Sequence, residues 1–392
     1  MGAAQQKDMV RRGGQPTRAP GPRILMPTCR NFMRSVYRCG IYEAEDVLVD
    51  IDNVDLICLE QGWGRGYEGW LRSPMYHGKL LNLNPGLKRV PLAREYDLLV
   101  AFCQDYWEIP HVNAIYRWRD HCKTCVCWID EMWAAQVPGY KHWLRALSQF
   151  DYVFIGCKGT VATLSNAIGR TCHWLPAGVD ALRFSPYPNP PDRVVDVYSI
   201  GRRWEGVHQA LLRAAGAGEI FYTHDTFAAA NADVHDHRQH RELFANVAKR
   251  SRYFMVAPAK MDDQVTRGQV EVGYRYYEGA AAGAVMIGQP PKCEAFTEQF
   301  PWRDVVIAIN PDGSDVTTVL SELASDPARV VAIGRRNAVE ALLRHDWLYR
   351  WKEIFRVAGI EPMPGLAERE RCLKDLADFA SNVTESEAST LP

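Results

Sequence analysis

The chain has 392 residues, of which 47% are hydrophobic and 24% are charged, and its formal net charge is −1. This composition is typical of a soluble globular protein, and the length predicts two domains rather than one. The charge balance argues against a general attraction to nucleic acid or to an anionic membrane, and no run of roughly 18 apolar residues predicts a spanning helix. We therefore expect no nucleic-acid partner and no integral membrane segment.

Short apolar runs of strand length recur through the first half of the chain. Residues 1–22 are basic and rich in Gly and Pro without an apolar core, so they are predicted as a disordered leader. Residues 23–176 are predicted as one α/β domain, with a helix at 157–169 after its last strand. The expected strands are 23–27, 47–51, 96–102, 125–130 and 152–156.

The second half repeats this alternation after a proline-rich stretch. Residues 177–194 are predicted as a linker, because closely spaced prolines interrupt both helices and central strands. Residues 195–342 are predicted as a second domain, residues 343–366 as a C-terminal helix, and residues 367–392 as a disordered tail. The expected strands of the second half are 194–201, 219–223, 252–258, 284–288 and 304–310. The pattern predicts two doubly wound parallel α/β domains facing each other across a cleft.

A turn suited to phosphate follows the first strand of the second half. Gly201 permits a tight turn there, and Arg202 and Arg203 stand immediately before a predicted helix. Free N–H groups at a helix N-terminus and two guanidinium groups are suited to binding a diphosphate. The alternative is that both arginines are solvated at the sheet edge or pair with nearby acids such as Glu205.

A second candidate region places a carboxylate before a run of small residues. A helix is predicted over 272–282, with Glu278 in its middle and Arg275 three residues earlier. A carboxylate at this position can accept two hydrogen bonds, as the vicinal hydroxyls of a ribose would offer. The alternative is an ion pair within the helix between Arg275 and Glu278.

Four motifs stand in this order along the chain: LPAGVDALRFSP, SIGRR, YEGAAAGAVMIG and HDWLYRWKEIF. They resemble those of GT-B glycosyltransferases of the group 1 type, which are retaining enzymes that use nucleotide-sugar donors. The resemblance implies two Rossmann-like domains, the first for the acceptor and the second for the donor, with a C-terminal helix that returns to the first. It implies that Glu278 binds the donor ribose and that Gly201 and Arg202 bind the diphosphate. Gly273 also stands where the family has a glycine.

The sequence departs from the family pattern in two places. Val270 stands where the family has the first of two glutamates, and Glu271 lies one residue too late. The family's lysine after the Gly-Arg pair is absent, and Arg203 or His208 is the nearest substitute. With Arg275 three residues before Glu278, the pattern is closer to a divergent branch that includes the spore-maturation (CgeB-like) proteins.

Acceptor groups are expected after strands of the first domain. The strand at 125–130 brings Asp130 and Glu131 to such an edge, where an acid pair could orient or deprotonate an acceptor hydroxyl. The alternative is that Asp130 caps the next helix or pairs with an arginine. A weaker candidate is the loop after the first strand, which contains Thr28, Arg30 and Asn31.

No metal and no tightly bound cofactor are predicted. The cysteines at 122, 125 and 127 lack a second pair at zinc-ribbon spacing, and the histidines at 224, 235, 237 and 240 match no zinc template. The group 1 resemblance likewise implies no tightly held divalent ion.

The predicted function is transfer of a hexosyl-type sugar, with retention, from a UDP- or GDP-linked donor to a hydroxyl group. The acceptor is expected to be a glycan, a lipid-linked molecule or a small molecule. Two alternatives remain: a sugar-nucleotide epimerase of the same fold, and a non-catalytic protein that binds nucleotides or glycans. Neither domain opens with a Gly-x-Gly-x-x-Gly turn, which argues against a nicotinamide oxidoreductase. Eleven cysteines without a secretion signal predict a cytoplasmic location, with the inner membrane surface as an alternative.

Overall fold

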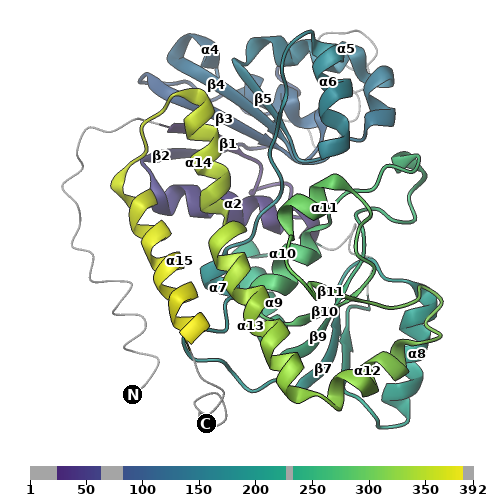
Figure 1. Ribbon diagram of the computed structural model, residues 1–392. Coiled ribbons are helices and arrows are strands. Elements are labelled where there is room, and N and C mark those ends of the chain that lie inside the picture. The colour runs from purple at the N-terminus through teal and green to yellow at the C-terminus, as the bar shows by residue number, and fades with distance from the viewer. Residues whose placement is uncertain (1–23, 63–82, 227–232, 383–392) are drawn as a thin grey trace.

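The structure, a computed structural model, describes residues 24–62, 83–226 and 233–382. The predicted leader and the last ten residues of the chain lie outside these described residues. Two sheets, one above the other in Figure 1, are each flanked by helices, and every strand pairing within them is parallel. The predicted fold class, two facing doubly wound α/β domains, is confirmed.

The first sheet has the strand order β2-β1-β3-β4-β5-β6. Its central strands are almost continuously apolar, as expected for parallel strands covered on both faces. The strands are β1 (Ile24–Thr28), β2 (Val54–Cys58), β3 (Tyr96–Cys103), β4 (Cys122–Ile129), β5 (Tyr152–Ile155) and β6 (His173–Trp174). The α-helices are α2 (Cys39–Ile51), α4 (Trp118–His121), α5 (Lys141–Leu144) and α6 (Val161–Ile168). Short 3-10 segments are η1 (Val36–Arg38), η2 (Tyr106–Ala114), η3 (Ala134–Tyr140), η4 (Arg145–Gln149) and η5 (Lys158–Thr160).

The expected strand at 47–51 is wrong, because these residues form the last turns of helix α2. Ala44, Leu48 and Ile51 are buried at helical spacing along one face of α2. The strand at this position in the chain is β2, which begins three residues later at Val54. A short apolar run does not by itself distinguish a strand from one turn of a buried helix.

The second sheet has the strand order β11-β10-β9-β7-β8. Its strands are β7 (Val195–Ser199), β8 (Tyr222–His224), β9 (Ser251–Val256), β10 (Val285–Gly288) and β11 (Val306–Ala308). The helices of the linker and the second domain are α7 (Ala181–Phe184), α8 (Glu205–Gly216), α9 (His237–Lys249), η7 (Gln264–Thr266), α10 (Tyr274–Ala281), α11 (Glu294–Gln299), α12 (Val316–Ala324) and α13 (Pro327–Arg344). The sequence predicted α10 and the helix that follows Arg203, which is α8.

The small residues of α10 allow this helix to lie directly on the second sheet. A Cβ atom added at Gly279 would come within 2.7 Å of the Phe254 ring and 3.0 Å of Cγ of Met286. Phe254 belongs to β9 and Met286 to β10, and both side chains are fully buried. The beginning of α10 lies beside the end of β9, since a Cβ atom added at Gly273 would be 3.2 Å from the carbonyl oxygen of Ala257.

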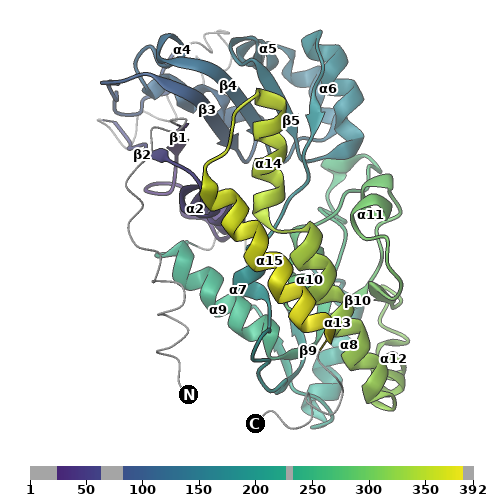
Figure 2. The ribbon, with the colours of Figure 1, turned by 60° about the vertical axis from the view of Figure 1, so that its left-hand side comes forward.

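Helices α13 and α14, near the end of the described chain, connect the two domains (Figure 2). Helix α13 packs on α10 of the second domain, and α14 (Trp347–Ala358) packs on α2 of the first. Trp351 of α14 donates a hydrogen bond from its indole N–H to the carbonyl of Ala44, over 2.9 Å. The Trp351 ring also lies 5.8 Å from the ring of Trp128 in the first sheet. The apolar core is therefore continuous from one domain to the other.

The disordered tail expected at 367–392 is wrong for the residues that the structure describes. Residues up to 382 form helix α15 (Pro364–Asn382), which lies along α13 and also contacts α2 (Figure 2). Leu366, Leu373, Ala377 and Ala380 are its buried residues. They recur at helical spacing in an otherwise polar stretch, a signal that the polar average composition concealed.

Candidate active site

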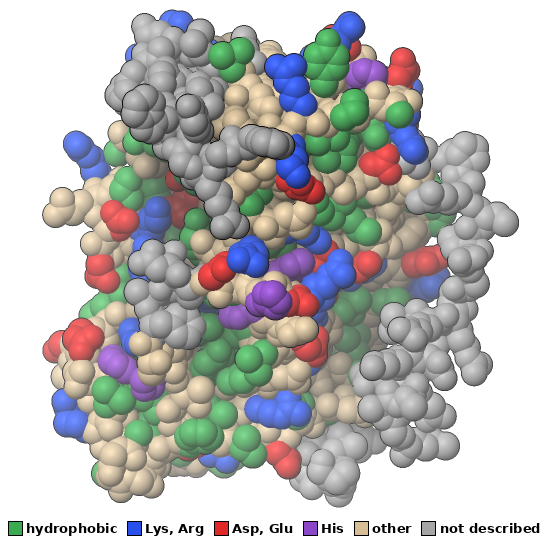
Figure 3. All heavy atoms as spheres, turned by 180° about the vertical axis from the view of Figure 1, so that it is seen from behind, with side chains coloured by type: hydrophobic (Ala, Val, Ile, Leu, Met, Phe, Trp, Pro, Cys, Tyr) green, Lys and Arg blue, Asp and Glu red, His purple; other side chains and the backbone are tan. Residues whose placement is uncertain are grey.

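A cavity of about 830 Å³ lies between the two domains. Its walls come largely from residues that follow strands, the edge of a doubly wound sheet where ligands bind. On the face of the molecule opposite to Figure 1, charged and histidine side chains gather in the band between the two halves (Figure 3). The main catalytic and donor-binding candidates from the sequence all line this cavity: Asp130, Glu131, Gly201, Arg202, Arg203, Gly273, Arg275 and Glu278.

The turn after β7 has a conformation that favours glycine, with a φ of +82° at Gly201. The Gly201 N–H donates to the carboxylate of Asp225 over 3.0 Å, and Arg203 donates to the same carboxylate over 2.5 Å. Asp225, rather than Glu205, is therefore the acid that pairs at this turn. Arg202 is exposed and makes no ion pair within the part of the chain that the structure describes. Arg202 is thus the arginine of this turn that remains available to an anionic ligand.

Glu278 is 1% exposed, and each of its carboxylate oxygens binds a different arginine. Arg275 donates to one oxygen and Arg241 of α9 donates to the other. Burial alone would raise the pKa of Glu278, but the two arginines lower it, so the carboxylate is charged at neutral pH. The Arg275–Glu278 pair considered from the sequence is present. Each oxygen keeps a second lone pair with which it can accept a hydrogen bond.

The guanidinium of Arg275 also lies beside the turn after β7. A Cβ atom added at Gly201 would be 3.8 Å from Nε of Arg275, with nothing between them. Gly273 is the N-cap residue of α10, so the positive end of this helix faces the same region. Positive charge from two arginines and a helix end is therefore concentrated on the second-domain wall.

Asp130 follows β4 and reaches across to the second domain. It accepts a hydrogen bond from the hydroxyl of Tyr274, over 2.8 Å, and another from the amide of Gln104, over 2.8 Å. Burial raises the pKa of Asp130 to about 7, an effect that the Tyr274 hydrogen bond opposes and neighbouring Glu131 reinforces. A carboxyl group with this pKa can exchange a proton near neutral pH. Neither a helix cap nor an arginine accounts for its contacts.

Glu131 also contacts the second domain. Its carboxylate pairs with Lys260, which lies in the loop after β9, and accepts a hydrogen bond from the indole of Trp133 over 2.7 Å. Lys260 lines the cavity and supplies a cation that the sequence did not indicate.

Several cavity residues were missed from the sequence. Asp105 follows β3, and burial raises its pKa to about 6; its place after a strand was the available signal. Burial lowers the pKa of His240 to about 4, and Arg241 adds to this effect, so the imidazole is neutral. Arg241 had no signal, because its partners come from distant parts of the chain.

Glu271, one residue later than the family pattern requires, joins the two domains. Its carboxylate accepts hydrogen bonds from the backbone N–H groups of Gly159, over 2.8 Å, and Lys158, over 3.2 Å. Both donors follow β5 in the first domain. Glu271 lines the cavity, but its hydrogen bonds go to protein backbone and to Gln269.

The weaker candidates lie elsewhere. Arg30 pairs with Glu45 and Asp46, and the loop that contains it is absent from the cavity wall among the described residues. His237 contacts Asp46. Within residues 24–62, 83–226 and 233–382, no group of three or more His, Cys, Asp or Glu side chains is placed to hold a metal.

In the same described ranges, no helix has the length and apolar character needed to cross a bilayer.

Comparison with known proteins gives the fold and a family match for the second half. Residues 192–356 match a family described as glycosyl transferase-like, whereas no curated protein matches the chain. An alpha-glucosyltransferase in complex with UDP-glucose and DNA containing an abasic site is 11% identical, with a TM-score of 0.52 over 86% of this chain and 99% of that one. The N-terminal domain of Candida albicans trehalose-6-phosphate phosphatase is 8% identical, with a TM-score of 0.54 over 88% and 98%. The fold is that of GT-B glycosyltransferases.

The prediction that the protein has no nucleic-acid partner is wrong, because the net charge on which it was based does not exclude one. Alpha-glucosyltransferase, whose fold this chain resembles, is seen with DNA and UDP in a second structure, 12% identical, with a TM-score of 0.50 over 86% of this chain and 100% of that one. Net charge is an average over the whole surface, whereas a nucleic acid meets only the charges of one region. A value of −1 therefore excludes no partner of this kind.

Proposed function

We propose that the protein is a glycosyltransferase that moves a sugar from a nucleoside diphosphate to an acceptor hydroxyl, with retention of configuration. One observation carries the proposal: a single cavity brings the Gly201–Arg202 turn and the Arg275–Glu278 pair of the second domain opposite Asp130 of the first. The second-domain side of the cavity supplies positive charge for a diphosphate and, at Glu278, a charged carboxylate for a ribose. The first-domain side supplies Asp130 as a proton acceptor.

The donor is assigned to residues 195–342 and the acceptor to residues 23–176. The two hydroxyls of the ribose would donate to Glu278, whose carboxylate stays charged between its two arginines. The Gly201 turn and Arg202 would bind the diphosphate, which would face Gly273 at the N-terminal end of α10. We propose UDP or GDP as the nucleotide and a hexose as the sugar, on the group 1 resemblance.

In the proposed reaction the acceptor oxygen forms a bond to the anomeric carbon while the bond to the diphosphate breaks. The electron pair of that bond leaves with the phosphate, and Arg202 and Arg275 stabilise the charge that develops there. The proton of the acceptor hydroxyl passes to Asp130, whose pKa of about 7 suits a general base. Glu131 and Lys260 would orient the acceptor. Retention is proposed from the resemblance to the retaining group 1 enzymes. The spacing of Arg275 and Glu278 supports, as a further part of the proposal, a position in the divergent branch that includes the CgeB-like proteins.

The acceptor is proposed to be a glycan, a lipid-linked molecule or a small molecule that presents a hydroxyl to Asp130. A cytoplasmic location is supported by the cysteines, all of which are free thiols. A lipid-linked acceptor would bring the protein to the inner surface of the membrane.

The test is a panel of UDP- and GDP-sugars in a thermal-shift assay, followed by product analysis of every sugar that binds. A donor present at 100 times its Kd should add about 2.7 kcal/mol to the free energy of unfolding. Glu278→Gln should abolish the shift, whereas Glu205→Gln, at an exposed acid beside the same turn, should leave it unchanged. Binding without any product would contradict the proposal in favour of a non-catalytic protein. Incorporation of solvent deuterium into the sugar without an acceptor would identify an epimerase.

A further inference from the structure

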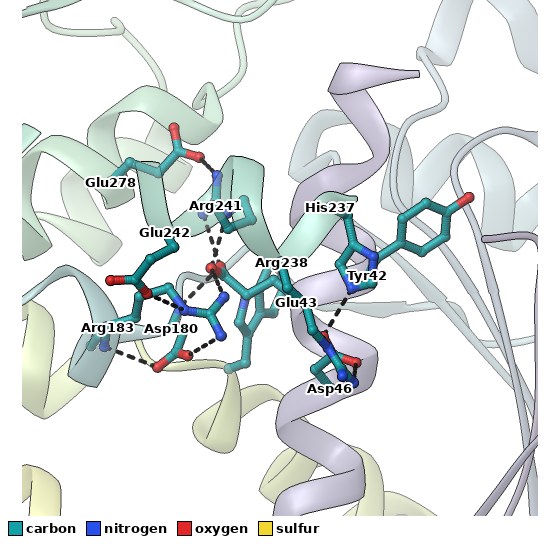
Figure 4. Close-up of polar contacts among 12 residues, drawn as sticks. Tyr42, Glu43, Asp46, Asp180, Arg183, His237, Arg238, Arg241, Glu242 and Glu278 are labelled. Carbon is teal, nitrogen blue, oxygen red and sulfur yellow. Dashed lines mark hydrogen bonds and ion pairs between the residues drawn. The ribbon is translucent and has the colours of Figure 1, made fainter. Parts of the chain in front are cut away.

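A buried chain of charges crosses from the first domain to the second (Figure 4). Glu43 of α2 accepts hydrogen bonds from Nε and Nη2 of Arg241 of α9, over 2.9 and 2.8 Å. The remaining nitrogen of the same guanidinium, Nη1, donates to Glu278 of α10. The side chains of Glu43, Arg241 and Glu278 are at most 3% exposed. A single guanidinium therefore binds one carboxylate from each domain, and all three side chains are almost fully buried.

Glu43 itself is fixed by groups other than Arg241. Its carboxylate also accepts hydrogen bonds from the backbone N–H of Asp180, over 3.0 Å, and from the indole N–H of Trp347, over 3.1 Å. Asp180 belongs to the linker and Trp347 to the crossing helix α14. Glu43 therefore contacts both the linker and a C-terminal helix from its place in the first domain. It does not line the cavity.

The geometry links the position of Arg241 to the arrangement of the domains. A guanidinium is planar and rigid, so Arg241 can hold both carboxylates only at one separation of α2 from α9 and α10. If the domains move apart, Arg241 loses either Glu43 or Glu278. Glu278 would then keep Arg275 as its charged partner, and Glu43 would keep Arg183. A buried carboxylate that loses one of two charged partners is less stable in its original orientation. The orientation of Glu278 thus depends on contacts made in the other domain.

We infer that Arg241 is a positioning residue that couples the arrangement of the two domains to binding of the donor nucleotide. Glu43 holds Arg241, and Arg241 in turn holds Glu278 in the orientation in which it meets the ribose. The inference rests on the proposed function, in which Glu278 binds the donor. If the arrangement in which Glu43 and Arg241 are paired raises the affinity for the donor, then binding of the donor favours that arrangement by the same factor.

The same two helices carry a second interdomain ion pair that serves as a matched control. Asp46 of α2 accepts hydrogen bonds from Nε and Nη2 of Arg238 of α9, each over 2.9 Å, and from His237. Neither Asp46 nor Arg238 lines the cavity or contacts Glu278. The side chain of Arg238 is 62% exposed, so loss of this pair changes the contact between the domains little and leaves the ribose-binding carboxylate in place.

The experiment measures the Kd of UDP-glucose and of GDP-glucose by titration calorimetry, together with the KM of donor and acceptor. Glu43→Gln should raise the Kd of the nucleotide sugar that binds wild type by about tenfold or more, the effect of one misplaced charged hydrogen bond. The KM of the acceptor should change by less than about twofold. Asp46→Asn should leave the donor Kd within about twofold of the wild-type value, since it removes an ion pair whose arginine is largely exposed and which does not contact Glu278.

A second pair of variants keeps the test decisive if Glu43→Gln does not fold. Arg241→Lys retains the charge but cannot bind both carboxylates through a fork, whereas Arg238→Lys makes the matching change at the control pair. Only Arg241→Lys should weaken donor binding. The inference would be overturned by an unchanged donor Kd in Arg241→Lys, or by an equal loss of donor affinity in the control variants. Neither result would affect the proposed function. Failure of wild type to bind either nucleotide sugar would overturn the proposed function and the inference with it.

Discussion

At the scale of single residues, Asp130 gives the most direct prediction. Because burial raises its pKa to about 7, the carboxylate needed to accept a proton is the minor form below that pH. We expect kcat/KM to rise with pH and to level off above about 7 to 8. Asp130→Asn should lower kcat by about 10²- to 10⁴-fold and remove this pH dependence. Initial rates measured from pH 5 to pH 9 test the expectation, and an unchanged acidic limb in Asp130→Asn would assign the titration to another group.

The raised pKa of Asp130 also makes the stability of the fold fall as the pH rises, opposite to the trend expected for kcat/KM. A carboxyl group whose folded pKa lies above its unfolded value stabilises the fold while it is protonated, and this contribution is lost as pH rises through about 7. Asparagine can keep both hydrogen-bonded neighbours of Asp130, Tyr274 and Gln104, without ionising. We therefore expect the melting temperature of Asp130→Asn to equal or exceed that of wild type at pH 8 and to fall below it at pH 5. Thermal unfolding followed at both pH values provides the measurement.

At the scale of elements, the contact of α10 with the second sheet predicts an asymmetry between two glycines. Gly279→Ala would force a methyl group against Phe254 and Met286, which costs about 1–3 kcal/mol in a packed core. Gly216→Ala, at the end of α8, meets no atom within 4 Å and gains helix propensity. We expect the first variant to be destabilised and the second to be neutral or stabilised in chemical denaturation. Equal effects would show that α10 does not lie tightly on the sheet.

Most elements could be predicted because their signal is local. The strand β3 is a long apolar run, and α10 ends at a glycine before β10, so both followed from neighbouring residues. The turn at Gly201 and the acid at Asp130 followed from the rule that ligand groups come after strands. Residues 47–51 were misread because a short apolar run fits both a strand and one turn of a buried helix, and α15 was missed because its apolar residues are sparse in a polar stretch. Arg241 was missed because its partners are distant in sequence, and an arginine in a polar helix gives no indication that two domains enclose it.

At the scale of the whole molecule, the continuous core predicts that the domains unfold together. Trp351 of α14 packs on Trp128 and Phe102 of the first sheet, while the same C-terminal segment continues from α13 on the second domain. Buried ion pairs and hydrogen bonds, among them Asp130–Tyr274, add to this contact. We expect wild type to show a single calorimetric transition whose van't Hoff and calorimetric enthalpies agree.

Trp351→Ala should separate that transition into two. The change removes a fully buried indole at the junction and costs about 3–5 kcal/mol, which falls on the contact between the domains rather than on either sheet alone. Phe379→Ala, at an aromatic residue of α15 that is 46% exposed, should leave one transition. If Trp351→Ala still unfolds in one step at a lower temperature, the polar contacts around the cavity are sufficient to couple the domains. The cavity would then be a stable part of the fold rather than a space that opens when the crossing helix is released.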